Sequence, residues 1–106
     1  FFEFTYPLKA DLVKTMENNF TKNISQAEFA YLSGRSLAAF KRDFKKVFSE
    51  SPGKWLKKKR LSLAHHLLKN TNKRPSVIYL EVGFEDYAHF SKSFKSSFGY
   101  SPSEVK

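Results

Sequence analysis

Residues 40–52 read F-K-R-D-F-K-K-V-F-S-E-S-P, and residues 90–102, fifty positions later, read F-S-K-S-F-K-S-S-F-G-Y-S-P. Six positions are identical at this offset, among them three phenylalanines spaced four residues apart. A glycine precedes each copy, at Gly34 and Gly83, one residue out of step. Repetition of this kind indicates one supersecondary unit that the chain uses twice.

The phenylalanine spacing predicts a helix in each copy, because residues four apart lie on one face of an α-helix. Ser36 is the expected N-cap of the first helix and Asp86 that of the second, which should span 87–98. The expected buried faces consist of Leu37, Phe40, Phe44, Val47 and Phe48 in the first copy, and Phe90, Phe94 and Phe98 in the second.

A shorter helix should precede each of these. Ser25 and Glu28 form a capping-box pattern, which predicts a helix over 26–32 with Phe29, Ala30 and Leu32 inward. Ser33-Gly34 should end it, since glycine readily adopts the left-handed conformation of a tight turn. Two short helices joined through a glycine turn, the second with a basic outer face, are typical of a helix-turn-helix.

The remaining segments complete an all-α prediction of about seven helices. Residues 1–7 look irregular, like the end of a linker or of a preceding domain, and 8–20 has helical spacing. A long bridging helix should cover 51–70, roughly 27 Å at 1.5 Å per residue, and a short one 76–82. A seventh helix should begin at the Ser101–Glu104 capping box and be cut off by the end of the chain. The expected subdomains are 8–50 and 71–106.

Composition narrows the functional classes. Twelve phenylalanines and 41% hydrophobic residues are enough for a small core, and no apolar run approaches the roughly 18 residues that cross a bilayer. The chain has no cysteine, so we expect no disulfide, thiol chemistry or Cys-containing zinc site. His65 and His66 are adjacent, about 100° apart on a helix, which is wrong for chelating one metal. We expect no catalytic residues, metal or cofactor.

Positive charge is concentrated in one segment. Between Arg35 and Arg74 there are thirteen Lys or Arg and two acids, whereas the rest of the chain has six Lys or Arg and eight acids. Such a concentration of positive charge is typical of proteins that bind a polyanion, and a nucleic acid is a better candidate than an acidic membrane. The alternative is that these residues only form a solvated, solubilising surface.

Motifs spread over residues 8–106 resemble the DNA-binding domain of the AraC/XylS family of bacterial transcriptional regulators. In the first half they are Gly34-Arg-Ser36, F-K-R-D-F-K at 40–45, Ser51-Pro52, Arg60-Leu61, Ala64 and Leu67-Leu68. In the second half they are E-V-G-F at 81–84, His89-Phe90-Ser91, Phe94-Lys95, Phe98-Gly99 and Ser101-Pro102. The resemblance implies two helix-turn-helix subdomains joined by a long central helix.

The resemblance also implies that recognition helices at about 36–48 and 86–98 enter successive major grooves of double-stranded DNA. The residues placed for base reading are Ala38, Lys41 and Arg42 in the first helix, and Tyr87, Ala88, Ser91 and Lys92 in the second. Arg42 is the strongest of these, because arginine commonly binds guanine O6 and N7. Tyr87 could equally be part of the core.

Other residues are expected to bind phosphates, which contribute affinity but no sequence information. They are Ser36, Lys45, Lys46, Lys57, Lys58, Lys59, His89 and Lys95. Arg60 falls at the bridging-helix arginine of the family, and we expect it to be structural, with an acid as one candidate partner. The first subdomain should dominate affinity, since it is expected to be far more basic than the second.

The chain departs from the family pattern at Pro75 and Tyr79, where an isoleucine or valine and an alanine are common. A bulky Tyr79 should push the helices at 76–82 and 87–98 apart or fill a compensating gap. The resemblance further implies a bacterial cytoplasmic, nucleoid-associated regulator, an activator or a repressor, with RNA polymerase and a dimer partner bound through a missing domain as candidate partners. The alternatives are a basic amphipathic helix over 54–69 that binds anionic membrane or a partner protein, and a structured-RNA binder.

Overall fold

The computed structural model describes residues 2–105 of the 106-residue chain, and within this range the regular elements are helices, joined by turns and loops, without a strand. The elements are α1 (Phe2–Asn19), α2 (Gln26–Leu32), α3 (Leu37–Phe48), α4 (Pro52–Asn70), α5 (Pro75–Glu81), α6 (Tyr87–Phe98) and the 3₁₀ turn η1 (Pro102–Glu104). The all-α prediction is therefore confirmed. Among the described helices, none has the length and apolar character that crossing a bilayer requires.

These elements divide into two compact units. The first contains residues 1–19 and 24–56, and the second contains residues 20–23 and 57–106. Helix α4 begins in the first unit and continues into the second. Residues 20–23, which directly follow α1, belong to the second unit, although they lie early in the sequence.

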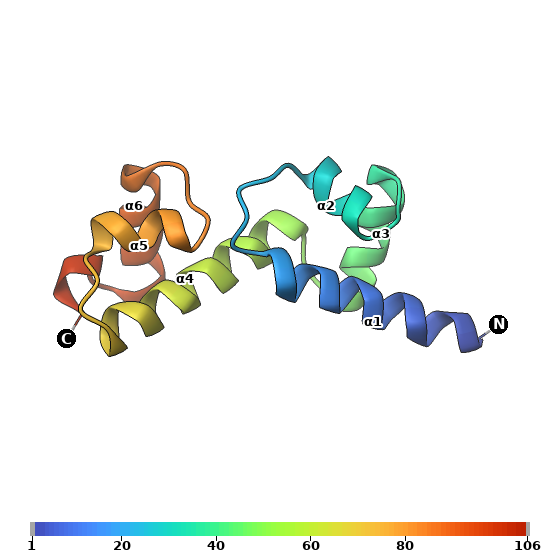
Figure 1. The fold of residues 1–106 in the computed structure, drawn as a ribbon, viewed down its shortest axis with the longest axis horizontal. Coiled ribbons are helices and arrows are strands. Elements are labelled where there is room, and N and C mark those ends of the chain that lie inside the picture. The colour runs from blue at the N-terminus through green and yellow to red at the C-terminus, as the bar shows by residue number, and fades with distance from the viewer. Residues whose placement is uncertain (1, 106) are drawn as a thin grey trace. The chain divides into compact units, whose positions relative to one another are not determined.

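In the first unit, α2 and α3 follow each other through a short turn (Figure 1). The turn is possible because Gly34 has a φ of 73°, in the left-handed region that glycine enters without strain. The core combines aromatic and aliphatic side chains that are buried or nearly so: Leu12, Met16, Phe29, Ala30, Phe40, Phe44, Trp55 and Leu56. Phe44 meets Trp55 edge-on, with ring centroids 5.8 Å apart.

Local capping fixes where α2 and α3 begin. The Ser25 hydroxyl accepts from the Glu28 amide at 3.1 Å, and the Glu28 carboxylate accepts from the Ser25 amide at 3.0 Å. Ser36 caps α3 by accepting from the Ala39 amide at 3.2 Å. The predicted bounds of both helices are confirmed.

The second unit repeats the succession with α5, a glycine turn and α6 (Figure 1). Asp86 caps α6 by accepting from the His89 amide at 3.2 Å, as expected. Its core consists of Leu61, Ala64, Ile78, Val82, Phe84, Phe90 and Phe94. The four inner phenylalanines of the repeat, two in each unit, are fully buried, and Phe48 and Phe98 are partly buried.

Several local expectations were wrong. Residues 2–7 are helical rather than irregular, because a proline such as Pro7 removes one backbone hydrogen bond without necessarily ending a helix. Leu32 and Leu37 are 46% and 40% exposed, although their spacing predicted inward positions. Both flank the glycine turn, where the packing partner no longer covers the helix face. The expected seventh helix is a single 3₁₀ turn, and α5 begins one residue early because Pro75 occupies its first position.

Candidate nucleic-acid interface

The outer face of α3 carries the residues predicted to read and hold DNA. Ala38, Lys41, Arg42 and Lys45 repeat at three- and four-residue intervals, so they share one side of the helix, opposite the buried phenylalanines. All four side chains are exposed, and so is that of Lys46 at the edge of this face. The first unit therefore presents one methyl group and four cations together.

Ser36 lies at the start of the same helix and is exposed, but its hydroxyl oxygen already accepts from the Ala39 amide. A hydroxyl can accept and donate at the same time, so its hydrogen remains able to donate to a phosphate oxygen. Capping and phosphate contact are compatible at this position.

An ion-pair chain joins Arg35, just before α3, to Asp43 and Arg42 on the helix itself, and it was missed by sequence reasoning. Arg35 Nε donates to Asp43 Oδ2 at 2.9 Å, and Arg42 Nε lies 3.3 Å from Asp43 Oδ1. Arg35 also donates from Nη1 to the carbonyl of Ser33 at 3.0 Å. The hydrogen bond from Arg35, assisted by Arg42, lowers the pKa of Asp43 below its ordinary value. The only sequence signal was an opposite-charge pair eight residues apart across the turn.

The exposure of these side chains differs in a way that matters for function. The side chain of Arg35 is 8% exposed, that of Asp43 is 29% exposed and that of Arg42 is 63% exposed. Arg35 is therefore a structural arginine, whereas Arg42 reaches solvent with part of its guanidinium bound.

Helix α6 presents the second predicted set, less completely. Ala88, Lys92 and Lys95 are exposed, whereas Ser91 is half-buried. His89 is exposed, but its ring also meets Phe84 edge-on at 5.5 Å, so it combines packing with access to solvent. Compared with α3, this face has fewer cations.

Tyr79 packs in the interface between α5 and α6. Its half-buried ring meets Tyr87 edge-on at 5.3 Å and lies 6.2 Å from Phe90. Tyr87 is 39% exposed, so it is partly a packing residue and partly available to a ligand. Tyr79 thus contributes its ring to the packing between α5 and α6.

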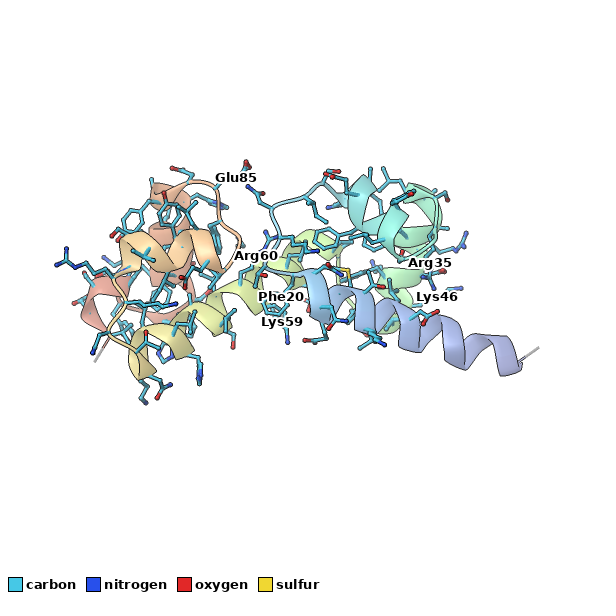
Figure 2. The ribbon with its side chains drawn as sticks, viewed as in Figure 1. Phe20, Arg35, Lys46, Lys59, Arg60 and Glu85 are labelled. Carbon is cyan, nitrogen blue, oxygen red and sulfur yellow. The ribbon has the colours of Figure 1, made fainter. Side chains whose placement is uncertain are left out.

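The lysines of α4 differ in exposure. Lys57 and Lys58 are exposed, whereas Lys59 is half-buried and its Nζ lies 5.3 Å from the centre of the Phe20 ring. This is a cation–π distance, so Lys59 is partly engaged within the second unit. Figure 2 labels both residues beside Arg60.

Arg60 has a structural role, as expected, and its hydrogen-bond partners are backbone carbonyls rather than an acid. Among the described residues, it donates from Nε to the carbonyl of Phe20 at 2.7 Å and from Nη2 to that of Lys22 at 3.0 Å. Burial lowers the pKa of Arg60 from its very high ordinary value. An added Cβ on Gly83 would lie 2.7 Å from Arg60 Nε and 2.9 Å from the Thr21 carbonyl oxygen. A glycine is therefore required beside this arginine.

Neither adjacent histidine of α4 is placed as a metal ligand. The ring of His65 lies 2.9 Å from the Tyr100 hydroxyl and packs on Phe98, and the His66 ring lies 3.2 Å from the Asn70 amide. Across the part of the chain that the structure describes, no three His, Cys, Asp or Glu side chains gather as a metal site.

Comparison with known proteins identifies the fold and family. A family model described as a helix-turn-helix domain matches residues 29–106. An AraC-type regulator structure from Chromobacterium violaceum aligns with a TM-score of 0.79 and 31% identity, covering 97% of this chain and 92% of that one. The chain belongs to the AraC/XylS family.

The proteins similar to this chain include named regulators of transcription. The virulence regulon transcriptional activator VirF of Yersinia enterocolitica is 34% identical over 95 residues, covering 90% of this chain and 35% of the relative. The regulator ExsA of Pseudomonas aeruginosa is 32% identical, covering 86% and 33%. The chain thus spans about a third of the length of these relatives.

A DNA-bound member of the AraC-type fold is also similar. The DNA-binding domain of AdpA, solved in complex with a target DNA, aligns with a TM-score of 0.82 at 21% identity, covering 90% of this chain and 86% of that one. At this identity the likeness establishes the shared fold. The predictions of an AraC-type helix-turn-helix fold and of a transcriptional-regulator domain are confirmed.

Proposed function

We propose that this AraC-type domain binds double-stranded DNA in a sequence-dependent manner, with α3 and α6 as its recognition helices in successive major grooves. The observation that supports this most directly is the outer face of α3, where Ala38, Lys41, Arg42 and Lys45 stand exposed on one side. Each recognition helix is the second helix of a helix-turn-helix, the position from which such motifs read the major groove.

In each unit, side-chain chemistry decides which residues are assigned to bases and which to phosphates. Arg42 and Lys92 are the guanine-reading candidates, Ala38 and Ala88 offer methyl groups to thymine, and Tyr87 offers the exposed part of its ring. Lys41 and Ser91 complete the base-reading set. Phosphates are held by Ser36, Lys45, Lys46, Lys57, Lys58, Lys59, His89 and Lys95.

The recognition helices suggest unequal contributions to affinity. Helix α3 contains Lys41, Arg42, Lys45 and Lys46, whereas α6 contains Lys92 and Lys95. As a whole, however, the second unit has eleven Lys or Arg and four acids, against eight and six in the first. Because α3 has more cations than α6, we expect it to contribute more of the binding free energy than α6 does. The lysines of α4 supply much of the second unit's attraction to DNA of any sequence.

The membrane alternative has little support in the structure. A membrane-surface helix needs an exposed apolar face, but the apolar residues of α4 are buried or, at Leu63, Leu67 and Leu68, partly buried against the core of the second unit. Trp55, Leu56, Leu61 and Ala64 are all at most 8% exposed.

At the level of the whole protein, we propose a non-enzymatic output domain of a bacterial transcriptional regulator that acts in the cytoplasm at the nucleoid. Activation through RNA polymerase and dimerisation through a further domain are part of the same proposal. Its support is that relatives such as VirF are named transcriptional activators and are about three times as long as the matched region.

Selection from a random duplex library tests the DNA-reading function. The wild-type chain should enrich one sequence, and Arg42→Ala and Lys92→Ala should each lose preference at a different base step. Arg35 and the buried phenylalanines should be left intact, so that both variants fold. Unchanged preference in both variants would remove the base-reading assignment, and enrichment of no sequence by the wild type would remove the proposed function.

A further inference from the structure

Asp43 holds two arginines with separate oxygens. Oδ2 accepts from Arg35 Nε at 2.9 Å, and Oδ1 lies 3.3 Å from Arg42 Nε. Arg35 is nearly buried and is held on its other side by the Ser33 carbonyl. Asp43 is consequently fixed by a partner that cannot swing away, and one of its oxygens remains directed to Arg42.

The contact occupies only one nitrogen of Arg42. A guanidinium has five N–H donors, and binding at Nε leaves the four on Nη1 and Nη2. These two nitrogens form the planar fork that can donate to both O6 and N7 of guanine. Because the side chain is 63% exposed, the fork has access to a ligand while its stem is held.

The geometry points to Asp43 as a positioning residue that sets the direction of the Arg42 fork and so determines how sharply the domain discriminates guanine. This inference rests on the proposed function. A free arginine has many rotamers and can turn to any nearby phosphate, whereas a held one loses less freedom when it binds a base. The carboxylate of Asp43 also repels phosphates, which weakens attraction to every DNA sequence alike.

The second unit provides an internal contrast. At the same offset of fifty, Lys92 stands in place of Arg42 and Ser93 in place of Asp43. Ser93 is 8% exposed and carries no charge that could hold Lys92. Discrimination at the base step read by Lys92 should therefore not depend on a neighbouring carboxylate that holds the side chain.

The test compares wild type, Arg42→Ala, Asp43→Asn and the double variant. Dissociation constants are measured at one salt concentration for the selected site, for that site with the Arg42-dependent guanine replaced, and for unrelated duplex. The wild type should prefer guanine by about ten- to hundredfold, the range of a good bidentate pair. Asp43→Asn should lower this preference by about three- to tenfold without weakening binding to unrelated duplex.

Two comparisons separate positioning from other effects. In the Arg42→Ala background, Asp43→Asn should change the guanine preference no further. Glu85→Gln removes one exposed negative charge from the second unit and serves as the charge-matched control, so it should leave guanine preference at the wild-type ratio. Equal weakening of all duplexes by Asp43→Asn, or an unchanged guanine ratio, overturns the inference.

A measurement on the free wild-type protein tests the same inference even if Asp43→Asn does not fold. Nitrogen-15 relaxation at Arg42 Nε should report an ordered group, in contrast to exposed arginines such as Arg74. An Arg42 Nε as mobile as that of Arg74 overturns the inference. If Arg42→Ala keeps the wild-type site preference while Lys92→Ala loses part of it, the Asp43 inference fails and sequence-specific DNA binding survives.

Discussion

Two glycines with similar turn roles differ sharply in what surrounds them. Gly34 and Gly83 both have positive φ, 73° and 111°, but a Cβ at Gly34 would meet nothing within 4 Å. A Cβ at Gly83 would meet the Arg60 guanidinium and a backbone carbonyl oxygen below 3.0 Å. The second turn therefore combines a backbone requirement with a packing requirement.

This difference predicts unequal costs of alanine substitution. Gly34→Ala should destabilise the first unit by about 1–2 kcal/mol, the cost of a left-handed alanine. Gly83→Ala should cost more, about 3 kcal/mol or above, because Arg60 or the backbone must also move. Urea unfolding of the two variants checks the order. Equal free energies of unfolding would show that the space around Gly83 relaxes freely.

Arg60 predicts a second effect at the residue scale. Arg60→Met keeps much of the side-chain length but leaves the carbonyls of Phe20 and Lys22 without their donor, so unfolding free energy should fall by about 1–3 kcal/mol. Thermal unfolding measures the loss, with Lys57→Met as an exposed control on the same helix. A loss no greater than that of the control would contradict a structural role for Arg60.

The pH dependence of stability follows from Asp43. Its pKa is lowered in the folded state by Arg35 and Arg42, so the ion pair contributes stability above the ordinary aspartate pKa, about 3.9. The contribution should be lost as pH falls through the lower, folded-state pKa. Melting curves should show the wild-type advantage over Asp43→Asn intact at pH 5 to 7 and shrinking below about pH 4. An advantage independent of pH down to 2 would contradict the assignment.

At the scale of helices, the repeat encoded the buried register. Phe40 and Phe90 are both fully buried at the same position of α3 and α6. Replacing either by alanine should reduce the unfolding free energy of its unit by about 3–5 kcal/mol. Tyr31→Ala, at a side chain that is 81% exposed, should change it by less than about 0.5 kcal/mol. Hydrogen exchange resolves which unit each variant affects.

Helix starts could be predicted because their caps are local. Ser25, Ser36 and Asp86 each bind an amide three residues ahead, so the determining partners lie within one turn of sequence. The exposed candidates on α3 could be predicted for a similar reason, since a buried phenylalanine register fixes the opposite face. Periodicity cannot show how far along a helix its packing partner extends. For this reason Leu32 and Leu37 were predicted to be buried, although both are exposed.

Long-range partners were beyond sequence reasoning. The acceptors of Arg60 are backbone carbonyls about forty residues away, and every residue has such a carbonyl. The Tyr79–Tyr87 ring contact likewise depends on how α5 and α6 pack, so sequence could state only that Tyr79 is larger than the usual alanine. The site residues themselves stay predictions until DNA binding is measured.

For the whole molecule, the proposed phosphate contacts predict a steep salt dependence. If about six of them form, log K against log salt should have a slope near −5. Lys45→Ala should make the slope shallower by about 1 and weaken all sequences alike, whereas Arg42→Ala should change preference between sequences. A slope near zero in a salt titration with duplex DNA would contradict the electrostatic proposal.

The second unit is assembled from two separated stretches of chain, residues 20–23 and 57–106. Arg60 binds the first stretch from the second, and Gly83 lies close to the same arginine. A peptide made of residues 57–106 would contain the complete second helix-turn-helix motif and still lack the acceptors of Arg60. The two halves of this duplicated chain are therefore not interchangeable parts. A cut or a recombination point between residues 23 and 57 would separate the two stretches of the second unit, although the repeat in the sequence suggests that each half is self-contained.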